Sequence, residues 1–243
     1  QGRLTLDGDV NKGLVSWKVP PTEVLGDELV TLRRLLTHTA GLTVHGFPGY
    51  AEGNALPTVP QILDGEKPAN TEAVRVDLAP DTQWRYSGGG YTVLQLLVSN
   101  VTGVPFAELM QELVLAPLGM SSSTYANPLP TEHHASASTA HWVTGTPVKG
   151  KWHTYPEMAA AGLWSTPTDL ARFVIAIQDA FQGRSETVLT QEMTKEQLSK
   201  GLGDWGLGLA LRGDGENTRF GHGGRDAGFD TLLEGYVRRG DGF

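Results

Sequence analysis

The 243-residue chain contains no cysteine, which excludes disulfides, iron–sulfur clusters, thiolate zinc sites and a catalytic thiol within it. No apolar run approaches the ~18 residues that a membrane-spanning helix needs. Basic residues are few: 19 Lys and Arg face 27 Asp and Glu, a formal charge of −8 that argues against nucleic acid or a polybasic membrane patch as a partner. The first residues, Gln1-Gly-Arg-Leu-Thr, do not resemble a signal peptide, so the sequence leaves the compartment open.

Several catalytic motifs are also missing. Nothing matches the G-x-S-x-G elbow of α/β-hydrolases or the H-E-x-x-H zinc motif. Gly201-Leu-Gly-Asp-Trp-Gly206 fits the dinucleotide fingerprint G-x-G-x-x-G, but a polar, helix-like stretch precedes it and a strand-like one follows, the reverse of what that site requires. The sequence therefore predicts neither a metal nor a cofactor.

The 31 glycines and 14 prolines that are present indicate many turns and long loops around helices. Helical spacing of apolar residues and capping signals predict helices at 31–38, 90–103, 105–115 and 166–181. Residues 43–81 are expected to form a loop with one short helix, and 121–157 a polar loop with short strands around 141–152. Short glycine-bounded segments at 205–212, 218–222 and 231–238 are typical of antiparallel strands. Helices followed by strands predict an α+β fold, mostly helical over about 1–200 and an antiparallel sheet over about 203–243.

Two glycine-rich segments are candidates for chemistry, Tyr86-Ser-Gly-Gly-Gly-Tyr91 and Gly221-His-Gly-Gly-Arg-Asp-Ala-Gly-Phe229. The first predicts a turn into a buried helix, whose N-terminal partial charge would favour an oxyanion or a phenolate beside Tyr86 and Ser87. The second places His222 at a strand end, followed by backbone against which a substrate can pair. Taken singly, each is better explained by turn glycines beside a structural tyrosine or a surface histidine.

Six segments follow one another in an order that carries more information than any one of them. They are Gly2–Asn11, Leu35-Leu-Thr-His-Thr-Ala-Gly-Leu42, Tyr86-Ser87-Gly88, Pro117-Leu-Gly-Met120, Ala161–Arg172 and His222-Gly223-Gly224. In this order they resemble the serine β-lactamase-like hydrolases, which include class C β-lactamases, DD-peptidases, D-amino-acid peptidases and β-lactamase-like esterases. The resemblance runs nearly end to end and implies a β-lactamase/transpeptidase-like fold.

The resemblance also implies a serine hydrolase that forms an acyl-enzyme on an ester or amide carbonyl. Tyr86 would relay the proton, which requires a neighbouring cation because a free tyrosine has a pKa of ~10. His222 would hold Tyr86 or the substrate from across the cleft, and the backbone N–H of Arg225 would supply half of an oxyanion hole. The substrate side of this site is expected to include Ser87, Gly88, Gly223 and Gly224.

The family's nucleophile is the serine of a Ser-x-x-Lys motif, and no lysine here has a serine three residues before it. Because Gly2–Asn11 resembles the stretch after the family's nucleophile helix, we expect the serine and lysine upstream of Gln1. The chain is then part of a β-lactamase-related domain, incomplete at both ends, with residues 239–243 starting a further strand. An unfinished sheet would leave a leucine face partly uncovered, at Leu207, Leu209, Leu211, Leu232 and Leu233.

Class C β-lactamases hold their substrate with two side chains: the asparagine that is the third residue of the tyrosine motif, and the lysine of the strand motif. At these two positions this chain has Gly88 and His222. Each lost charged contact is worth about 1.5–3 kcal/mol, which favours an esterase acting on a small ester, amide or peptide. Three alternatives stay open: a D-amino-acid peptidase, a β-lactamase and a non-catalytic penicillin-binding-like module. The missing serine favours the last of these. Family members are often exported in bacteria, so a periplasmic or secreted location fits; the sequence gives no oligomeric state.

Overall fold

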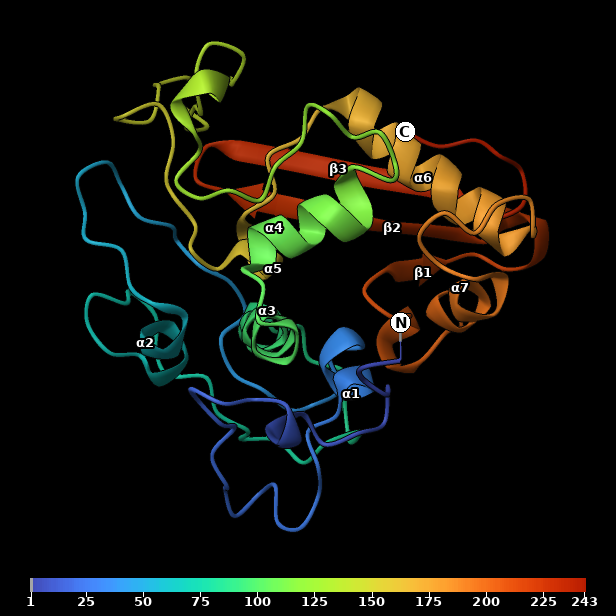
Figure 1. The fold of residues 1–243 in the computed structure, drawn as a ribbon, viewed down its shortest axis with the longest axis horizontal. Helices are drawn as coiled ribbons and strands as arrows, with labels where there is room; N and C mark the ends of the chain where they lie inside the picture. The colour runs from blue at the N-terminus through green and yellow to red at the C-terminus, as the bar shows by residue number, and fades with distance from the viewer. Residues whose placement is uncertain (1) are drawn as a thin grey trace.

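A computed structural model describes residues 2–243, which are arranged around one buried helix, α3 (Gly88–Thr102) (Figure 1). Helices α1 (Leu32–Leu36), α2 (Val59–Asp64), α4 (Phe106–Met110) and α5 (Met158–Ala161) contact α3. A π-helical turn, Gln111–Leu115, continues α4. Two further helices, α6 (Pro167–Phe181) and α7 (Gln191–Gln197), pack on each other beside the sheet. Short 3₁₀ turns lie at Val10–Lys12, Thr131–His133, Leu202–Asp204 and Gly215–Asn217.

Helix α3 has a capping residue at each end. The Ser87 hydroxyl accepts a hydrogen bond from the Gly90 N–H at 3.0 Å, and Gly103 ends the helix in the left-handed region at φ 72°. This confirms the helix predicted at 90–103, with a start two residues earlier. Within residues 2–243 no single helix is long and apolar enough to cross a membrane; α3 and the segment Phe106–Leu115 pass that test only as a pair bent by 84°.

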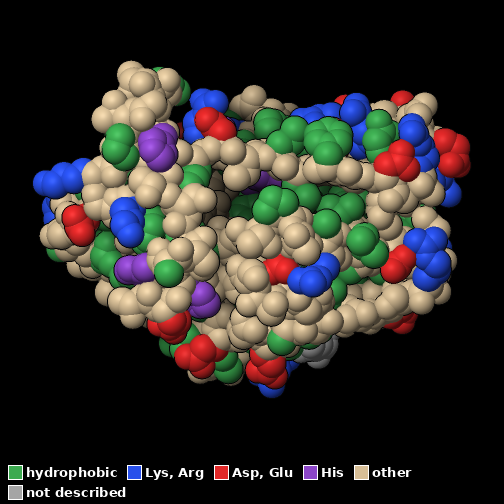
Figure 2. Space-filling view, turned by 90° about the horizontal axis from the view of Figure 1, so that it is seen from above, with side chains coloured by type: hydrophobic (Ala, Val, Ile, Leu, Met, Phe, Trp, Pro, Cys, Tyr) green, Lys and Arg blue, Asp and Glu red, His purple; other side chains and the backbone are tan. Residues whose placement is uncertain are grey.

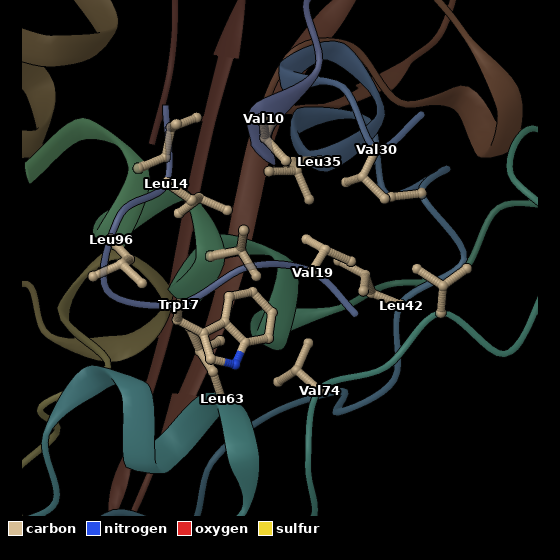
Figure 3. Packing of buried hydrophobic residues seen from close by; sticks show 14 of the residues in the cluster. Val10, Leu14, Trp17, Val19, Val30, Leu35, Leu42, Leu63, Val74 and Leu96 are labelled. Carbon is tan, nitrogen blue, oxygen red and sulfur yellow. The ribbon is translucent and has the colours of Figure 1, made fainter. Parts of the chain in front are cut away.

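The apolar residues of α3 form the larger of two hydrophobic cores with α1, α2 and the N-terminal segment (Figure 3). Leu97 and Leu63 have no exposed surface, and Leu35 is 1% exposed. Trp17 fills the space beside α2 and satisfies its indole N–H by donating to Asp64 at 3.0 Å. This core fixes the direction in which the N-terminus of α3 points.

The sheet has three antiparallel strands in the order β1 (Ala210–Arg212), β2 (Arg219–Asp226) and β3 (Phe229–Tyr236). Helix α6 packs on it and buries Phe220 and Leu211 completely (Figure 1). The expectation of an uncovered leucine face is therefore wrong for Leu207, Leu209 and Leu211, which are at most 7% exposed. Leu233 is half-buried, and Leu232 is 53% exposed.

The predicted elements differ from the structure mainly at their ends. The helix expected at 31–38 ends at Leu36, because His38 takes a left-handed conformation with φ 59°. The strand expected at 205–212 begins only at Ala210, because a tight turn, with Gly208 at φ 89°, precedes it. Residues 141–152 contain one isolated bridge rather than strands. After β3, Phe243 and Glu234 exchange two backbone hydrogen bonds of 2.8 Å, which form an isolated antiparallel bridge between Gly235 and Gly242.

Gly41 and Gly119 offer a matched test of the packing beside α1. Both have positive φ, 70° and 65°, but a Cβ on Gly41 would lie 2.0 Å from the Leu78 carbonyl oxygen, whereas one on Gly119 would meet nothing within 4 Å. Gly119→Ala should cost about 1–2 kcal/mol of unfolding free energy from backbone strain alone. Gly41→Ala should cost more than about 3 kcal/mol, because strain and a backbone clash add. Urea unfolding of both variants measures this; equal losses would contradict the packing described.

Candidate active site

Ser87 has a structural role beside the candidate site. It is 3% exposed, and its hydroxyl donates to the Thr43 carbonyl at 2.7 Å while accepting from Gly90. Both hydrogen-bonding functions are therefore used inside the protein. The Ser87 side chain is thus buried as the N-cap of α3, and is not exposed on a substrate side as the sequence analysis expected.

The first backbone donors of α3 are also occupied. The N–H groups of Gly88 and Gly89 donate to the carbonyls of His45 and Val44, each at 3.0 Å. The predicted stabilisation of an oxyanion or phenolate by this helix end is thus not available through these donors. A side chain at residue 88 would be tightly placed, because a Cβ there would lie 3.1 Å from the His45 carbonyl oxygen and 3.2 Å from Phe47. An asparagine at residue 88 would require these neighbours to shift by a few tenths of an ångström.

Tyr86 and His222 lie in contact, which is one of the two arrangements that the family resemblance implied. The Tyr86 hydroxyl lies 3.3 Å from His222 Nε2, across 136 positions of the chain. Tyr86 directly precedes the N-cap of α3, whereas His222 lies within β2 and not at a strand end as expected. The strand is longer than predicted because residues 223–226 continue to pair with β3. Figure 2 shows a hollow in this molecule with a histidine side chain inside it.

An aromatic cluster that sequence analysis missed surrounds this pair. The His38 ring stacks on Tyr86 with 4.2 Å between centroids, and Nδ1 of His38 accepts a hydrogen bond from the Ser87 N–H at 3.1 Å. Trp205 lies edge-on to both Tyr86 and His222, with centroids 5.9 and 5.5 Å away. His38 could have been predicted as a site residue, because it is the histidine of the Leu-Leu-Thr-His segment that carries the family resemblance. Nothing in the sequence marks Trp205 as a site residue.

Burial makes this cluster electrically neutral near pH 7. It raises the pKa of the Tyr86 phenol and lowers the pKa of His222. Burial, assisted by the charges of His222 and His45, lowers the pKa of His38 to about 3. A phenolate at Tyr86 therefore needs a cation that these neighbours do not supply. No cluster of three or more His, Asp or Glu side chains suited to a metal ion occurs between residues 2 and 243.

The edge of β2 beside this pair is open. Strand β1 pairs with β2 only over Arg219–Gly221, so residues 222–226 pair with β3 alone. Gly223, Gly224 and Arg225 are exposed, and the open stretch is about 16 Å long at ~3.3 Å per residue. The Arg225 guanidinium pairs with Asp230 and its side chain is 82% exposed, so only the main chain of Arg225 is placed to serve the cleft. An extended ligand can add to this edge by backbone hydrogen bonds.

His38 gives the first prediction for this site. Because its pKa is about 3 when folded and 6.5 when free, the unfolded chain binds more protons between these values, and stability falls as the pH drops from 6.5 towards 3. His38→Gln should flatten this dependence, measured as urea unfolding free energy from pH 7 to pH 4. His133→Gln, outside the cleft, is the control. An unchanged slope in His38→Gln would show that His38 is not held neutral.

Comparison with known proteins gives one family. The family model described as Beta-lactamase matches residues 1–236. Among curated proteins, the chain is 27% identical to the Escherichia coli D-alanyl-D-alanine-carboxypeptidase/endopeptidase AmpH over 60% of its own length and 35% of AmpH. It is 32% identical to esterase EstB of Burkholderia gladioli over 54% of its length and 34% of EstB. The chain spans less than half the length of the curated relatives it matches.

Solved structures agree on the fold. A D-stereospecific amidohydrolase from Streptomyces superposes with a TM-score of 0.74 at 22% identity, covering 99% of this chain and 74% of that one. An octameric penicillin-binding protein homologue from Pyrococcus abyssi superposes with a TM-score of 0.70 at 20% identity, covering 99% of this chain and 55% of that one. The predicted α+β, β-lactamase/transpeptidase-like fold is therefore confirmed.

Proposed function

Because the chain belongs to the beta-lactamase family, we propose that it forms the Tyr86–His222 side of the active site of a serine esterase. The observation that carries this proposal is the contact between the two side chains at the open edge of β2. A hydroxyl, an imidazole and free strand backbone in one cleft are the groups that acyl transfer needs for proton relay and substrate alignment. The substrate would be a small ester, amide or peptide.

We place the nucleophile outside residues 1–243. The chain has no Ser-x-x-Lys, and its matches cover 35% of AmpH and 34% of EstB, so much of each relative has no counterpart here. The serine and lysine would come from the segment before Gln1 in the whole protein. That lysine would supply the cation that the neutral surroundings of Tyr86 lack.

In this mechanism the serine oxygen attacks the carbonyl carbon while its proton passes to the Tyr86 phenolate. The carbonyl π electrons move to the oxygen, which accepts hydrogen bonds from the Arg225 N–H and from the N–H of the serine. As the tetrahedral intermediate collapses, the C–O bond to the alcohol breaks and Tyr86 returns the proton to the leaving oxygen. Water then repeats the sequence on the acyl-enzyme. His222 would orient the Tyr86 oxygen, and Gly223 and Gly224 would let the substrate approach the strand closely.

The preference for esters over β-lactams rests on two positions. Residue 88 carries no amide, and a Cβ there would already be in tight contact with the His45 carbonyl and the Phe47 ring. His222 is held neutral by burial, so it offers no fixed charge to the carboxylate of a penicillin or cephalosporin. The relationship to EstB supports an esterase, and the relationship to AmpH supports a peptidase as the alternative.

Replacing Tyr86 tests the proton relay in the whole protein. Tyr86→Phe should lower kcat on a 4-nitrophenyl ester by about 10² or more with little change in KM, because general acid–base catalysis contributes about that factor. Tyr125→Phe is the matched control, since Tyr125 packs against Phe106 away from the cleft. Steady-state kinetics of both variants measure the effect. Retained kcat in Tyr86→Phe would reduce Tyr86 to a packing role.

A comparison of kcat/KM between substrate classes tests the esterase assignment. The whole protein should hydrolyse short 4-nitrophenyl esters with kcat/KM at least about tenfold above that for a cephalosporin, because one charged contact is worth about 1.5 kcal/mol or more. Faster cephalosporin turnover would contradict the assignment, and cleavage of D-amino-acid amides alone would move it to the peptidases. Binding without turnover of any of these would indicate a non-catalytic module.

A further inference from the structure

His38 is a buried histidine whose backbone conformation is unusual. It is 3% exposed and follows the C-cap of α1 in the left-handed region, at φ 59°, where helix ends usually have glycine or asparagine. Left-handed backbone costs a residue that has a side chain roughly 1–2 kcal/mol. A histidine at this position therefore points to a role for its side chain.

His38 holds the segment that carries Tyr86 at two points. Its carbonyl oxygen accepts a hydrogen bond from the Arg85 N–H at 3.0 Å, and its side-chain Nδ1 accepts one from the Ser87 N–H at 3.1 Å. These two N–H groups belong to the residues immediately before and after Tyr86. The ring of His38 also lies against the Tyr86 ring, with 4.2 Å between centroids. One residue therefore fixes the main chain on both sides of Tyr86 and contacts its side chain.

This arrangement requires one protonation state of His38. A ring nitrogen that accepts a hydrogen bond carries no proton, so the neutral imidazole has its proton on Nε2. Burial is the largest of the effects that lower the pKa of His38 to about 3, and the ring is therefore neutral near pH 7. Among residues 2–243, Nε2 has no hydrogen-bond partner, and the ring lies edge-on to Trp84 and Trp205 with centroids 6.1 and 5.1 Å away. The one hydrogen bond that the His38 side chain makes within the described chain is thus the bond to Ser87.

The contact between Tyr86 and His222 tolerates little movement. The Tyr86 hydroxyl lies 3.3 Å from His222 Nε2, near the outer limit of a hydrogen bond, so a shift of a few tenths of an ångström breaks it. His222 is held independently, by the pairing of β2 with β3. Side chains that take part in catalysis must keep their geometry to within about 0.5 Å, and the residues packed around them provide that precision. On the Tyr86 side of the contact, His38 is placed to provide it.

We propose that His38 is a positioning residue that holds Tyr86 in place for proton transfer, an inference that rests on the proposed function. Because His38 is buried, it acts through Tyr86 and not on the substrate. Loss of the Nδ1 acceptor would leave the buried N–H of Ser87 unpaired and allow the turn before α3 to shift. Catalysis would then lose rate in the chemical step, while substrate binding would change little. A histidine that only filled the core would not need an acceptor at Nδ1.

Two substitutions at residue 38 of the whole protein separate the acceptor from the ring. His38→Asn keeps an acceptor, because Oδ1 of asparagine is bonded to Cγ as Nδ1 is, and asparagine tolerates left-handed backbone; His38→Leu has no acceptor. His38→Leu should lower kcat on a 4-nitrophenyl ester by at least about tenfold with KM within about threefold, and His38→Asn should recover most of that loss. His133→Leu, outside the cleft, is the control. Unchanged kcat in His38→Leu, or equal losses in both variants, would overturn the proposal.

A Tyr86→Phe background shows whether His38 acts through Tyr86. In that background, His38→Leu should change kcat by less than about threefold, because the proton relay that His38 positions is already gone. All rates are corrected for spontaneous hydrolysis, and unchanged melting shows that the variants are folded. The same fold-loss from His38→Leu in both backgrounds would mean a general structural role and would contradict positioning of Tyr86.

Imidazole ¹⁵N NMR of the whole wild-type protein separates this proposal from the hydrolase function. Near pH 7 the spectrum should show the His38 proton on Nε2 and none on Nδ1. A proton on Nδ1 would overturn the proposal even if esters are hydrolysed. A proton on Nε2, together with retained kcat in Tyr86→Phe, would refute the relay and uphold only the hold of His38 on Ser87. This measurement needs no variant, so it decides the hydrogen bond even if His38→Leu does not fold.

Discussion

The contact between Tyr86 and His222 joins the helical part of the chain to the sheet, and the cleft exists because both partners are held from behind. Tyr86 is fixed by the start of α3, where the carbonyls of residues 43–45 occupy the helix donors and the Ser87 hydroxyl. His222 is fixed by β2, which pairs with β3 along its length and packs under α6. Groups positioned by a rigid core in this way keep a geometry suited to catalysis without movement of the cleft surface.

The cleft differs in charge from one end to the other. Around Tyr86, burial keeps His38 and His222 uncharged, so the proposed proton relay through Tyr86 would require a cation from elsewhere. About 13 Å along β2 from His222, at ~3.3 Å per residue, lies the half-buried Asp226, whose pKa burial raises to about 6. A ligand lying on the strand edge would thus meet neutral aromatic groups at Tyr86 and a carboxyl group at the far end of β2.

Local chemistry made part of this architecture predictable. Thr166 and Gly103 mark helix ends by capping, and both act as expected, with the Thr166 hydroxyl accepting from Asp169 N at 3.2 Å. The pairing of Tyr86 with His222 was predictable only through the ordered resemblance of six segments. The complete burial of Glu157 was not predictable, because nothing in the local sequence marks this acid as an interior residue. The covered Leu209 and Leu211 were missed for the same reason, since residues of α6, from a distant part of the sequence, pack over them.

The central claim is that this chain supplies the relay side of a serine hydrolase and not its nucleophile. Intact-mass spectrometry after treatment with a fluorophosphonate tests it most directly, because that reagent forms a stable bond only with an activated serine. The account predicts no adduct on the 243-residue chain and one adduct per molecule on the whole protein, at a serine outside residues 1–243. Stoichiometric labelling of any serine within residues 1–243 would contradict the account.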